Sequence, residues 1–295
     1  MENKKIKVFG VGISGLVGTS IAEFLQDKYS FTNLSSDTGI DITNPSTLDG
    51  IRTDTEHSIV FHLAAKADVD GCEKDRELGE EGAAYKINVL GTKNVVDATR
   101  DGKKKIIFVS TDFVFDGKNP PEGGYTEEDE PHPINWYGET KYKGEEIVRY
   151  SGIPYVILRI TYPYRNGESP SNVKPDFVHI LRDRLKNNQP TAGVTDQIIT
   201  PTFIDDIALA LDTLITTDSR GTYHVVGSQS VSGYDAVMMI AEKYGLDKSL
   251  ISKTTNEEFN RGKAPRPFNL TTNNAKIIKL GMKMRSFQEG LKELT

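Results

Sequence analysis

Residues 6–18 read IKVFGVGISGLVG, and this stretch decides the fold. An apolar, partly β-branched run at 6–11 predicts a buried strand, and three glycines follow it in a GxxGxxG spacing. Residues 16–28 then carry a helical pattern. A glycine turn in this position lets the backbone approach a pyrophosphate, whose charge the N–H groups of the helix N-terminus can meet. The spacing is not the GxGxxG of the common dinucleotide fingerprint, so the context carries most of the signal.

The rest of the chain alternates short apolar runs with helical segments. Strands are expected at 31–34, 58–63, 105–110 and 155–160, and helices at 81–100 and 136–151. This alternation is typical of βαβ units, whose strands form a parallel sheet covered by helices on both faces. We therefore expect an α/β fold with a Rossmann-type, doubly wound parallel sheet.

The composition of the sequence changes after residue 160. A stretch rich in Pro, Gly and Asn is followed by expected helices at 177–186, 204–215 and 233–243 and an expected strand at 222–226. We expect an NAD(P)-binding Rossmann domain of residues 1–160 plus about 203–226, and a smaller C-terminal substrate-binding lobe of about 161–202 and 227–295. Residues 116–135 form the longest irregular stretch and are a candidate binding loop.

Composition and charge exclude several classes of protein. The 295-residue chain has a net charge of −6, and an acidic chain is poorly suited to nucleic acid. It has no apolar run of bilayer length and no sign of a signal peptide before the first strand, so we expect a cytoplasmic protein without a membrane partner. Cys72 is the single cysteine, the five histidines are scattered, and the acidic run at 68–75 lacks a calcium-loop glycine, so we expect neither a disulfide nor a metal site.

The charge is also distributed unevenly along the chain. Residues 253–295 hold nine Lys and Arg residues against four Glu, whereas the remainder of the chain is strongly acidic. A basic segment on an acidic protein is either a solvated surface or a surface that meets an anionic ligand. The sequence leaves both alternatives open.

Two further segments fit the ligand of a glycine turn. Asp41 and Ile42 follow the second expected strand, where the carboxylate could accept a hydrogen bond from an adenine and the isoleucine could pack on its ring. Residues 63–65 end the third strand with Leu-Ala-Ala, and small residues suit a backbone that passes close to a cofactor. Taken alone, each segment fits a surface aspartate or a small core residue equally well.

A tyrosine, a lysine and a strand-end hydroxyl form the chemical part of the pattern. Tyr137 and Lys141 are four residues apart on an expected helix, hence on one face. A neighbouring ammonium lowers the pKa of a phenol from about 10 toward neutral pH, which suits acid–base catalysis. Thr111 and Asp112 end the fourth strand, at the edge where open α/β sheets bind ligands. With the glycine turn, these residues form a strong combined signal.

In these motifs the chain resembles the extended short-chain dehydrogenase/reductases, and within them the dTDP-4-dehydrorhamnose reductases, which reduce a 4-keto sugar nucleotide in rhamnose synthesis. The most specific segments are STDFVFDG at 110–117 and NWYGETK at 135–141. The resemblance runs nearly end to end and includes AAKADVDGCEKD at 64–75, DQIITPTFIDDIA at 196–208 and RPFNLTTNNAKIIKLG at 266–281.

The resemblance implies a cofactor, NADP(H) or NAD(H), and the residues that bind it. They are Gly12, Gly15, Leu16, Val17 and Gly18 at the pyrophosphate, Asp41 and Ile42 at the adenine, and Leu63, Ala64 and Ala65 along the cofactor. The second strand ends without the Arg of an unambiguous 2′-phosphate site. Asp37 favours NAD(H), whereas Ser35 and Ser36 could bond a 2′-phosphate, so the choice stays open.

The resemblance also implies catalytic and substrate residues. Tyr137 would protonate the C4 oxygen as hydride arrives, while Lys141 would tune the phenol and bind the nicotinamide ribose. Thr111 and Asp112 would bind near the carbonyl, Tyr162 would replace the family's tryptophan as an aromatic platform, and Arg266 would face the diphosphate of a nucleotide-sugar substrate. Asn88 matches a helix asparagine for which a structural role is at least as well supported as a catalytic one. A homodimer is a further expectation.

Three alternatives share the fold. A 4,6-dehydratase needs an acid–base Glu after Thr-Asp, and Phe113 stands there instead. A nucleotide-sugar epimerase would keep the same Tyr/Lys pair, so only segments 110–117 and 196–202 argue against it. The regulatory β subunit of methionine adenosyltransferase shares the motifs but acts by binding a partner protein, so a dinucleotide-binding regulatory subunit is the non-enzyme alternative.

Overall fold

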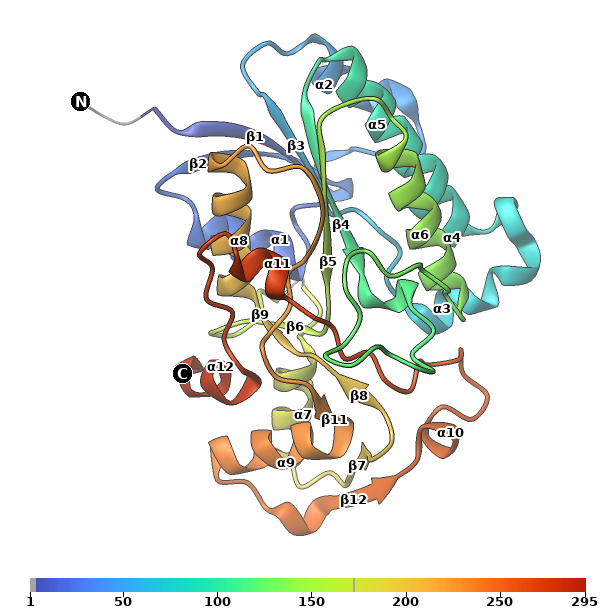
Figure 1. Ribbon diagram of the computed structural model, residues 1–295, viewed down its shortest axis with the longest axis vertical. Coiled ribbons are helices and arrows are strands. Elements are labelled where there is room, and N and C mark those ends of the chain that lie inside the picture. The colour runs from blue at the N-terminus through green and yellow to red at the C-terminus, as the bar shows by residue number, and fades with distance from the viewer. Residues whose placement is uncertain (1–3, 172) are drawn as a thin grey trace.

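The computed structural model describes residues 4–171 and 173–295. Its central strands are β1 (Ile6–Val11), β2 (Tyr29–Leu34), β3 (Ile59–His62), β4 (Lys105–Thr111), β5 (Tyr155–Ile160) and β10 (Gly221–His224). They form one six-stranded sheet in the order β10-β5-β4-β3-β1-β2, and every neighbouring pair is parallel (Figure 1). The predicted α/β fold with a doubly wound parallel sheet is confirmed.

Helices cover both faces of the sheet (Figure 1). α1 (Leu16–Phe24) and α8 (Ile204–Thr216) share one core with the strands, and α2 (Asp49–Thr53), α5 (Thr92–Asp101) and α6 (Trp136–Arg149) pack on the other side. All four residues of β3 are buried because helices cover both of its faces. This is why the strands appear in the sequence as continuous apolar runs.

Two expected element boundaries differ from those in the structure. β2 begins at Tyr29, before the expected start, because Tyr29 pairs with Ile6 at the beginning of the parallel ladder. α1 ends at Phe24 rather than at residue 28, because the chain turns there: the backbone N–H groups of Lys28 and Tyr29 both donate to the carbonyl of Leu25. The turn uses residues whose side-chain pattern still suits a helix.

The helix expected at 81–100 is divided into three pieces. α4 (Ala83–Tyr85) leads into a π-helix at Lys86–Gly91, which continues as α5. The backbone comes close to Ile42 at the end of the π-helix, where a Cβ on Gly91 would lie 2.6 Å from Ile42 Cδ1. π-Helical turns often occur at functional sites. The apolar spacing of the sequence does not distinguish such a turn from an α-helix.

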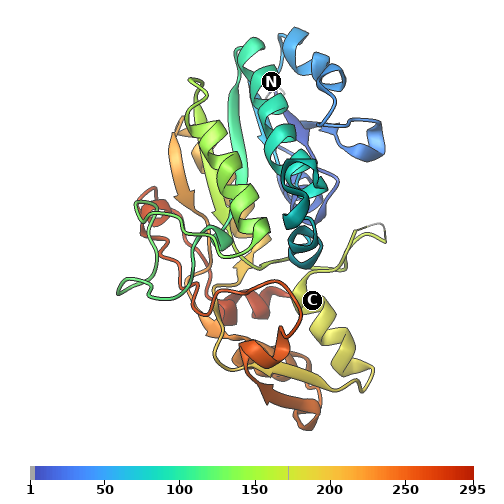
Figure 2. The same ribbon diagram turned by 90° about the vertical axis from the view of Figure 1, so that its right-hand side faces the viewer.

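The later part of the chain packs against the carboxyl end of the sheet (Figures 1 and 2). α7 (Phe177–Lys186), α9 (Gly233–Tyr244) and α12 (Phe287–Glu293) share a separate apolar core. Three small sheets complete it: β6 (Pro163–Tyr164) with β9 (Thr202–Phe203), β7 (Thr191–Val194) with β12 (Ile251–Thr254), and β8 (Ile198–Ile199) with β11 (Val231–Ser232). The domain boundaries given above stay a prediction.

The remaining short helices are α3 (Val69–Lys74), α10 (Asn256–Phe259) and α11 (Ala275–Ile278). No helix in residues 4–171 and 173–295 combines the length and the apolar character that crossing a membrane requires.

Candidate functional site

A cavity of about 860 Å³ lies at the carboxyl ends of β1, β3, β4 and β5. The residues that the sequence analysis assigned to the pyrophosphate, the adenine, the catalytic group and the substrate all line it: Gly12, Gly15, Leu16, Val17, Gly18, Asp41, Ile42, Leu63, Ala64, Ala65, Thr111, Asp112, Tyr137, Lys141, Tyr162 and Arg266. Asp37, which bears on the choice of cofactor, is not among the lining residues. The structure brings these segments together because parallel strands end at one edge of the sheet. The chemical roles of the residues stay predictions.

The three glycines of the turn differ in what they allow. Gly12 has φ +76°, and a Cβ there would lie 2.5 Å from the backbone of Ala64. A Cβ on Gly18 would lie 2.3 Å from the carbonyl oxygen of Ile13. A Cβ on Gly15, in contrast, would meet only the Gly12 oxygen, at 3.7 Å. The fold itself requires Gly12 and Gly18, whereas the open space at Gly15 suits the close approach of a ligand.

The N-terminus of α1 faces this open space. Gly15 is its N-cap residue, and in the described structure no side chain caps the helix. The first backbone N–H groups of a helix have no intrahelical partner and carry a partial positive charge. An anionic group above Gly15 would therefore find donors and favourable charge without displacing a protein contact.

Asp41 and Ile42 line the same cavity from the segment that follows β2. The exposed Asp41 accepts hydrogen bonds at Oδ1 from the backbone N–H and the hydroxyl of Thr43, at 2.9 and 2.7 Å. Ile42 is buried, and its carbonyl accepts a hydrogen bond from Asn94 Nδ2 at 2.9 Å. These contacts hold an acceptor and an apolar wall in fixed positions.

Thr111 and Asp112 lie where β4 ends. The Thr111 hydroxyl donates to Asp112 Oδ1 at 3.1 Å and accepts from the backbone N–H of Phe113 at 3.2 Å. Burial raises the pKa of Asp112 to about 6, although the Thr111 hydroxyl lowers it. The sequence analysis missed Thr161, which follows β5 and lines the same cavity with a buried hydroxyl. The strand-end rule that found Thr111 would also have found Thr161.

Tyr137 stands in the first turn of α6, with its ring edge-on to Phe113 at a centroid distance of 5.9 Å. Burial raises the pKa of its phenol above the ordinary value, the Asp112 carboxylate raises it further, and the Thr111 hydroxyl opposes the shift. This direction is opposite to the one expected from the Tyr/Lys spacing. The phenol therefore keeps its proton at neutral pH in this structure, as a proton donor must before it acts.

Lys141 explains the difference. Its Nζ donates to the carbonyl of Val109 at 2.8 Å and lies 4.1 Å from the centroid of the Phe108 ring. The side chain is almost fully buried, and burial lowers the pKa of the ammonium to about 7, although Glu145 raises it. Helical spacing correctly put Tyr137 and Lys141 on one face. The ammonium is hydrogen-bonded to Val109 in β4, a contact that helical spacing could not reveal.

Asn88 has a structural role. It is fully buried in the π-helix and does not line the cavity. Its Oδ1 accepts from the backbone N–H of Lys66 at 2.8 Å, and its Nδ2 donates to the Lys66 carbonyl at 3.1 Å and to Thr140 Oγ1 at 3.0 Å. Asn88 thus connects the segment after β3 to α6, two parts of the chain that both contribute residues to the cavity lining.

Tyr162 lines the cavity from the segment after β5. Its φ is +38°, in the left-handed region where a residue with a Cβ is strained by about 1 kcal/mol or more. The ring packs edge-on against Phe177 at 5.6 Å, and burial raises the pKa of its phenol to about 12. Surrounding contacts must hold this conformation, because the isolated chain would avoid it.

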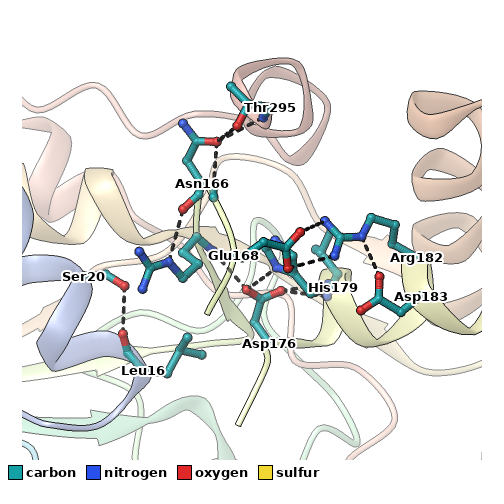
Figure 3. A network of polar contacts seen from close by, with 12 residues as sticks. Leu16, Ser20, Asn166, Glu168, Asp176, His179, Arg182, Asp183 and Thr295 are labelled. Carbon is teal, nitrogen blue, oxygen red and sulfur yellow. Dashed lines mark hydrogen bonds and ion pairs between the residues drawn. The ribbon is translucent and has the colours of Figure 1, made fainter. Parts of the chain in front are cut away.

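A polar network lies at the start of α7, where Phe177 packs against Tyr162 (Figure 3). Asp176 caps α7, since its Oδ1 accepts from the backbone N–H groups of Val178 and His179 at 2.9 and 3.1 Å. Its Oδ2 contacts His179 Nδ1 at 2.7 Å and accepts from the backbone N–H of Arg165 at 3.3 Å. The chain that leaves the cavity at Tyr162 is therefore fixed to α7 within a few residues.

Arg266 lines the cavity from the C-terminal part of the chain. Its guanidinium donates to Asp70 Oδ1 at 2.8 Å and to the carbonyl of Ala264 at 2.9 Å. Arg266 also lines a second cavity of about 430 Å³, together with Arg261 and Lys263. These three cations of the basic segment lie at cavities. The acidic run at 68–75 supplies Asp70 as an ion-pair partner, and the described residues contain no group of three or more potential metal ligands.

The role of a binding loop at 116–135 stays a prediction. None of its described residues lines the 860 Å³ cavity, but Ile134 lines the cavity of about 430 Å³. The loop is fastened to the C-terminal segment, since the backbone N–H of Tyr125 donates to Thr271 at 2.9 Å and that of Asn269 donates to Gly117 at 3.0 Å.

Comparison with known protein families supports these observations. The model of the RmlD substrate binding domain matches residues 6–295, almost the entire chain. The chain belongs to this family. The resemblance inferred from the motifs is confirmed.

Other proteins similar to the chain carry three different descriptions. A dTDP-4-dehydrorhamnose reductase from Bacillus anthracis, solved in complex with NADP, has a TM-score of 0.86 and 31% identity over 99% of each chain. The spore coat polysaccharide biosynthesis protein SpsK of Bacillus subtilis is 34% identical over 80% of this chain and 77% of its own length. Methionine adenosyltransferase 2 subunit beta of Xenopus laevis is 27% identical over 96% of this chain and 85% of its own length.

Proposed function

We propose that this RmlD family member uses NAD(P)H to reduce the C4 keto group of a nucleotide-linked 4-keto-6-deoxy sugar, as a dTDP-4-dehydrorhamnose reductase does in dTDP-rhamnose biosynthesis. One observation carries the proposal: a protonated phenol, a strand-end hydroxyl and an open glycine turn share one cavity. The similarity to the B. anthracis reductase supports the same function. A cytoplasmic location and a homodimer stay predictions.

Different lining residues would bind the dinucleotide and the nucleotide sugar. Gly15 and the N-terminus of α1 fit a pyrophosphate, and the bound dinucleotide would supply the hydride. Thr111 orients the carbonyl oxygen of the sugar by a hydrogen bond. Tyr137 donates its proton to that oxygen as negative charge develops there. Arg266 binds the substrate diphosphate.

An initial-rate assay tests the proposal. The purified protein is mixed with NADH or NADPH and dTDP-4-keto-6-deoxymannose, and cofactor oxidation is followed by absorbance. We expect substrate-dependent oxidation with at least one cofactor. Dinucleotide binding without oxidation would contradict the enzyme assignment. It would favour a regulatory subunit like the methionine adenosyltransferase subunit, which the similarity to that protein also supports.

Alanine substitutions at two glycines separate ligand contact from fold. Gly15→Ala should lower dinucleotide affinity about tenfold or more while lowering the free energy of unfolding by no more than about 1 kcal/mol, because alanine is a poorer N-cap than glycine but its Cβ would meet only the Gly12 oxygen, at 3.7 Å. Gly18→Ala should destabilise the protein by about 1–3 kcal/mol, because its Cβ overlaps the Ile13 carbonyl. Fluorescence titration and urea unfolding measure the two effects. Equal losses of stability in both variants would contradict the assignment.

Removing the Arg266 charge tests its role in substrate binding. Arg266→Gln should raise the KM for the nucleotide sugar about tenfold or more and leave the Kd for the dinucleotide nearly unchanged, because the contacts of Arg266 are with Asp70 and Ala264 and not with the glycine turn. Lys292→Gln, at an exposed position of α12, is the control for lost positive charge. An unchanged KM in Arg266→Gln would assign Arg266 to the Asp70 ion pair alone.

A further inference from the structure

The turn after β2 is fastened to the glycine turn. β1 and β2 pair in register up to Val11 and Leu34, and the backbone N–H of Gly12 donates to the Leu34 carbonyl at 3.0 Å. The backbone N–H of Ser14 donates to Ser35 Oγ at 3.3 Å, and the Ser14 hydroxyl donates to Asp37 Oδ1 at 3.1 Å. These contacts bring the Asp37 carboxylate next to the residues that fit a pyrophosphate.

The position of Asp37 has a known meaning in this fold. An acidic residue about 20 positions after the glycine turn accepts hydrogen bonds from the 2′-hydroxyl of the adenine ribose, whereas an arginine nearby accommodates a 2′-phosphate. Asp37 stands at this distance from Gly18, just beyond the end of β2. Asp37 is not itself among the residues that line the cavity, but Ser14, which holds it, and its neighbours Ser35 and Ser36 are, and its carboxylate is exposed.

The charges around the cavity point the same way. Among the described residues, Lys141 and Arg266 are the cations that line it; Lys141 is bonded to Val109, and Arg266 to Asp70 and Ala264. The segments at 12–18, 34–42 and 63–67 contribute no lining Lys or Arg. A 2′-phosphate there would meet Asp37 and no cation, and repulsion between like charges disfavours binding.

The two serines do not offset this charge. Ser35 is buried at the cavity wall, and its hydroxyl accepts from the Ser14 backbone N–H, so it too could offer a phosphate only one neutral donor. Ser36 is exposed and lines the cavity, so it can offer one neutral hydroxyl. A neutral donor bonds a phosphate oxygen more weakly than a cation does and leaves the repulsion from Asp37 in place.

We propose that Asp37, held by Ser14, selects a dinucleotide with a free 2′-hydroxyl, so that the chain binds NADH more tightly than NADPH. This inference rests on the proposed function insofar as the cavity must take a dinucleotide. It goes beyond family membership, because the B. anthracis relative was solved with NADP.

The test measures equilibrium binding and needs no turnover. The Kd values of NADH and NADPH are determined for the purified full chain by nicotinamide fluorescence at low and high salt. We expect NADH to bind about tenfold more tightly or better at low salt, and the preference to shrink at high salt because salt screens the exposed carboxylate. NADPH binding as tightly as NADH would overturn the inference and leave the proposed function standing. Binding of neither dinucleotide would overturn both.

Two substitutions assign the preference to one carboxylate. Asp37→Asn should tighten NADPH binding several-fold and reduce the preference for NADH, because it removes the negative charge and keeps an oxygen for Ser14. Asp27→Asn is the matched control, since Asp27 is an exposed carboxylate whose sequence neighbours do not line the cavity, unlike those of Asp37. It should leave the ratio of the two Kd values unchanged. An unchanged ratio in Asp37→Asn, with thermal unfolding as in the wild type, would overturn the inference.

Discussion

Replacing Tyr137 by Phe should lower kcat about a thousandfold while the Kd of the dinucleotide changes less than about twofold. The size of the loss is that of a positioned general acid, whose contribution is about 10²–10⁴-fold. The substitution removes only the phenolic oxygen, and the ring keeps its edge-on contact with Phe113. Stopped-flow turnover and fluorescence titration measure the two quantities separately.

Tyr162→Phe is the matched control for this prediction. It removes a second phenol from the same cavity, one that packs against Phe177 and does not touch Thr111 by any contact seen here. Its kcat should stay within about tenfold of the wild type, since no proton transfer depends on it. If Tyr137→Phe retained activity within a few-fold, Tyr137 would not be the acid.

Replacing Lys141 by Met should reduce activity and stabilise the protein at the same time. The loss in kcat should be about a hundredfold or more, because the substitution removes from the cavity the amino group that would bind the nicotinamide ribose and orient the cofactor. Below pH 7, however, the free energy of unfolding of the variant should exceed that of the wild type by about 2–3 kcal/mol. The wild type must bury a charged ammonium whose hydrogen bond is to a carbonyl and not to a carboxylate, and this burial destabilises the folded state.

The pH dependence of this gain follows from the lowered pKa. In the unfolded chain Lys141 titrates near 10.4, and in the folded protein burial lowers its pKa to about 7. The unfolded state therefore binds more protons between these values, so the wild type gains stability as pH rises from about 7 to 10. The advantage of Lys141→Met should be complete at pH 6 and fade by pH 10. Urea unfolding of both proteins at the two pH values would contradict this account if their difference stayed constant.

The parts of the site that could be predicted from the sequence depend on local rules. A glycine turn after a strand, a hydroxyl at the next strand end and a Tyr/Lys pair on one helix each occupy a short segment. Parallel strands place their carboxyl ends at one edge of the sheet. Local signals at Gly12, Thr111 and Tyr137 were therefore enough to predict that these residues line one cavity. Family resemblance then supplied Arg266, which no local rule would have connected to it.

The parts that could not be predicted depend on contacts between distant segments. Residues 116–135 are long and irregular in the sequence, and nothing in that pattern predicts that they pair with residues 269–273 across the fold. The predicted direction of the Tyr137 pKa shift was wrong for a similar reason. Spacing along α6 shows that Lys141 is near, but only the packed structure shows that its Nζ is bonded to Val109 and that the phenol is buried.

The most direct test of the central claim follows the hydride itself. The protein is incubated with dTDP-4-keto-6-deoxymannose and a nicotinamide dinucleotide that carries deuterium on either face of C4, and the product is examined by NMR and mass spectrometry. The account predicts one deuterium at C4 of the sugar, transferred from one face of the cofactor only, and loss of this transfer in Tyr137→Phe. Tight binding of the dinucleotide with no deuterium in the sugar would contradict it.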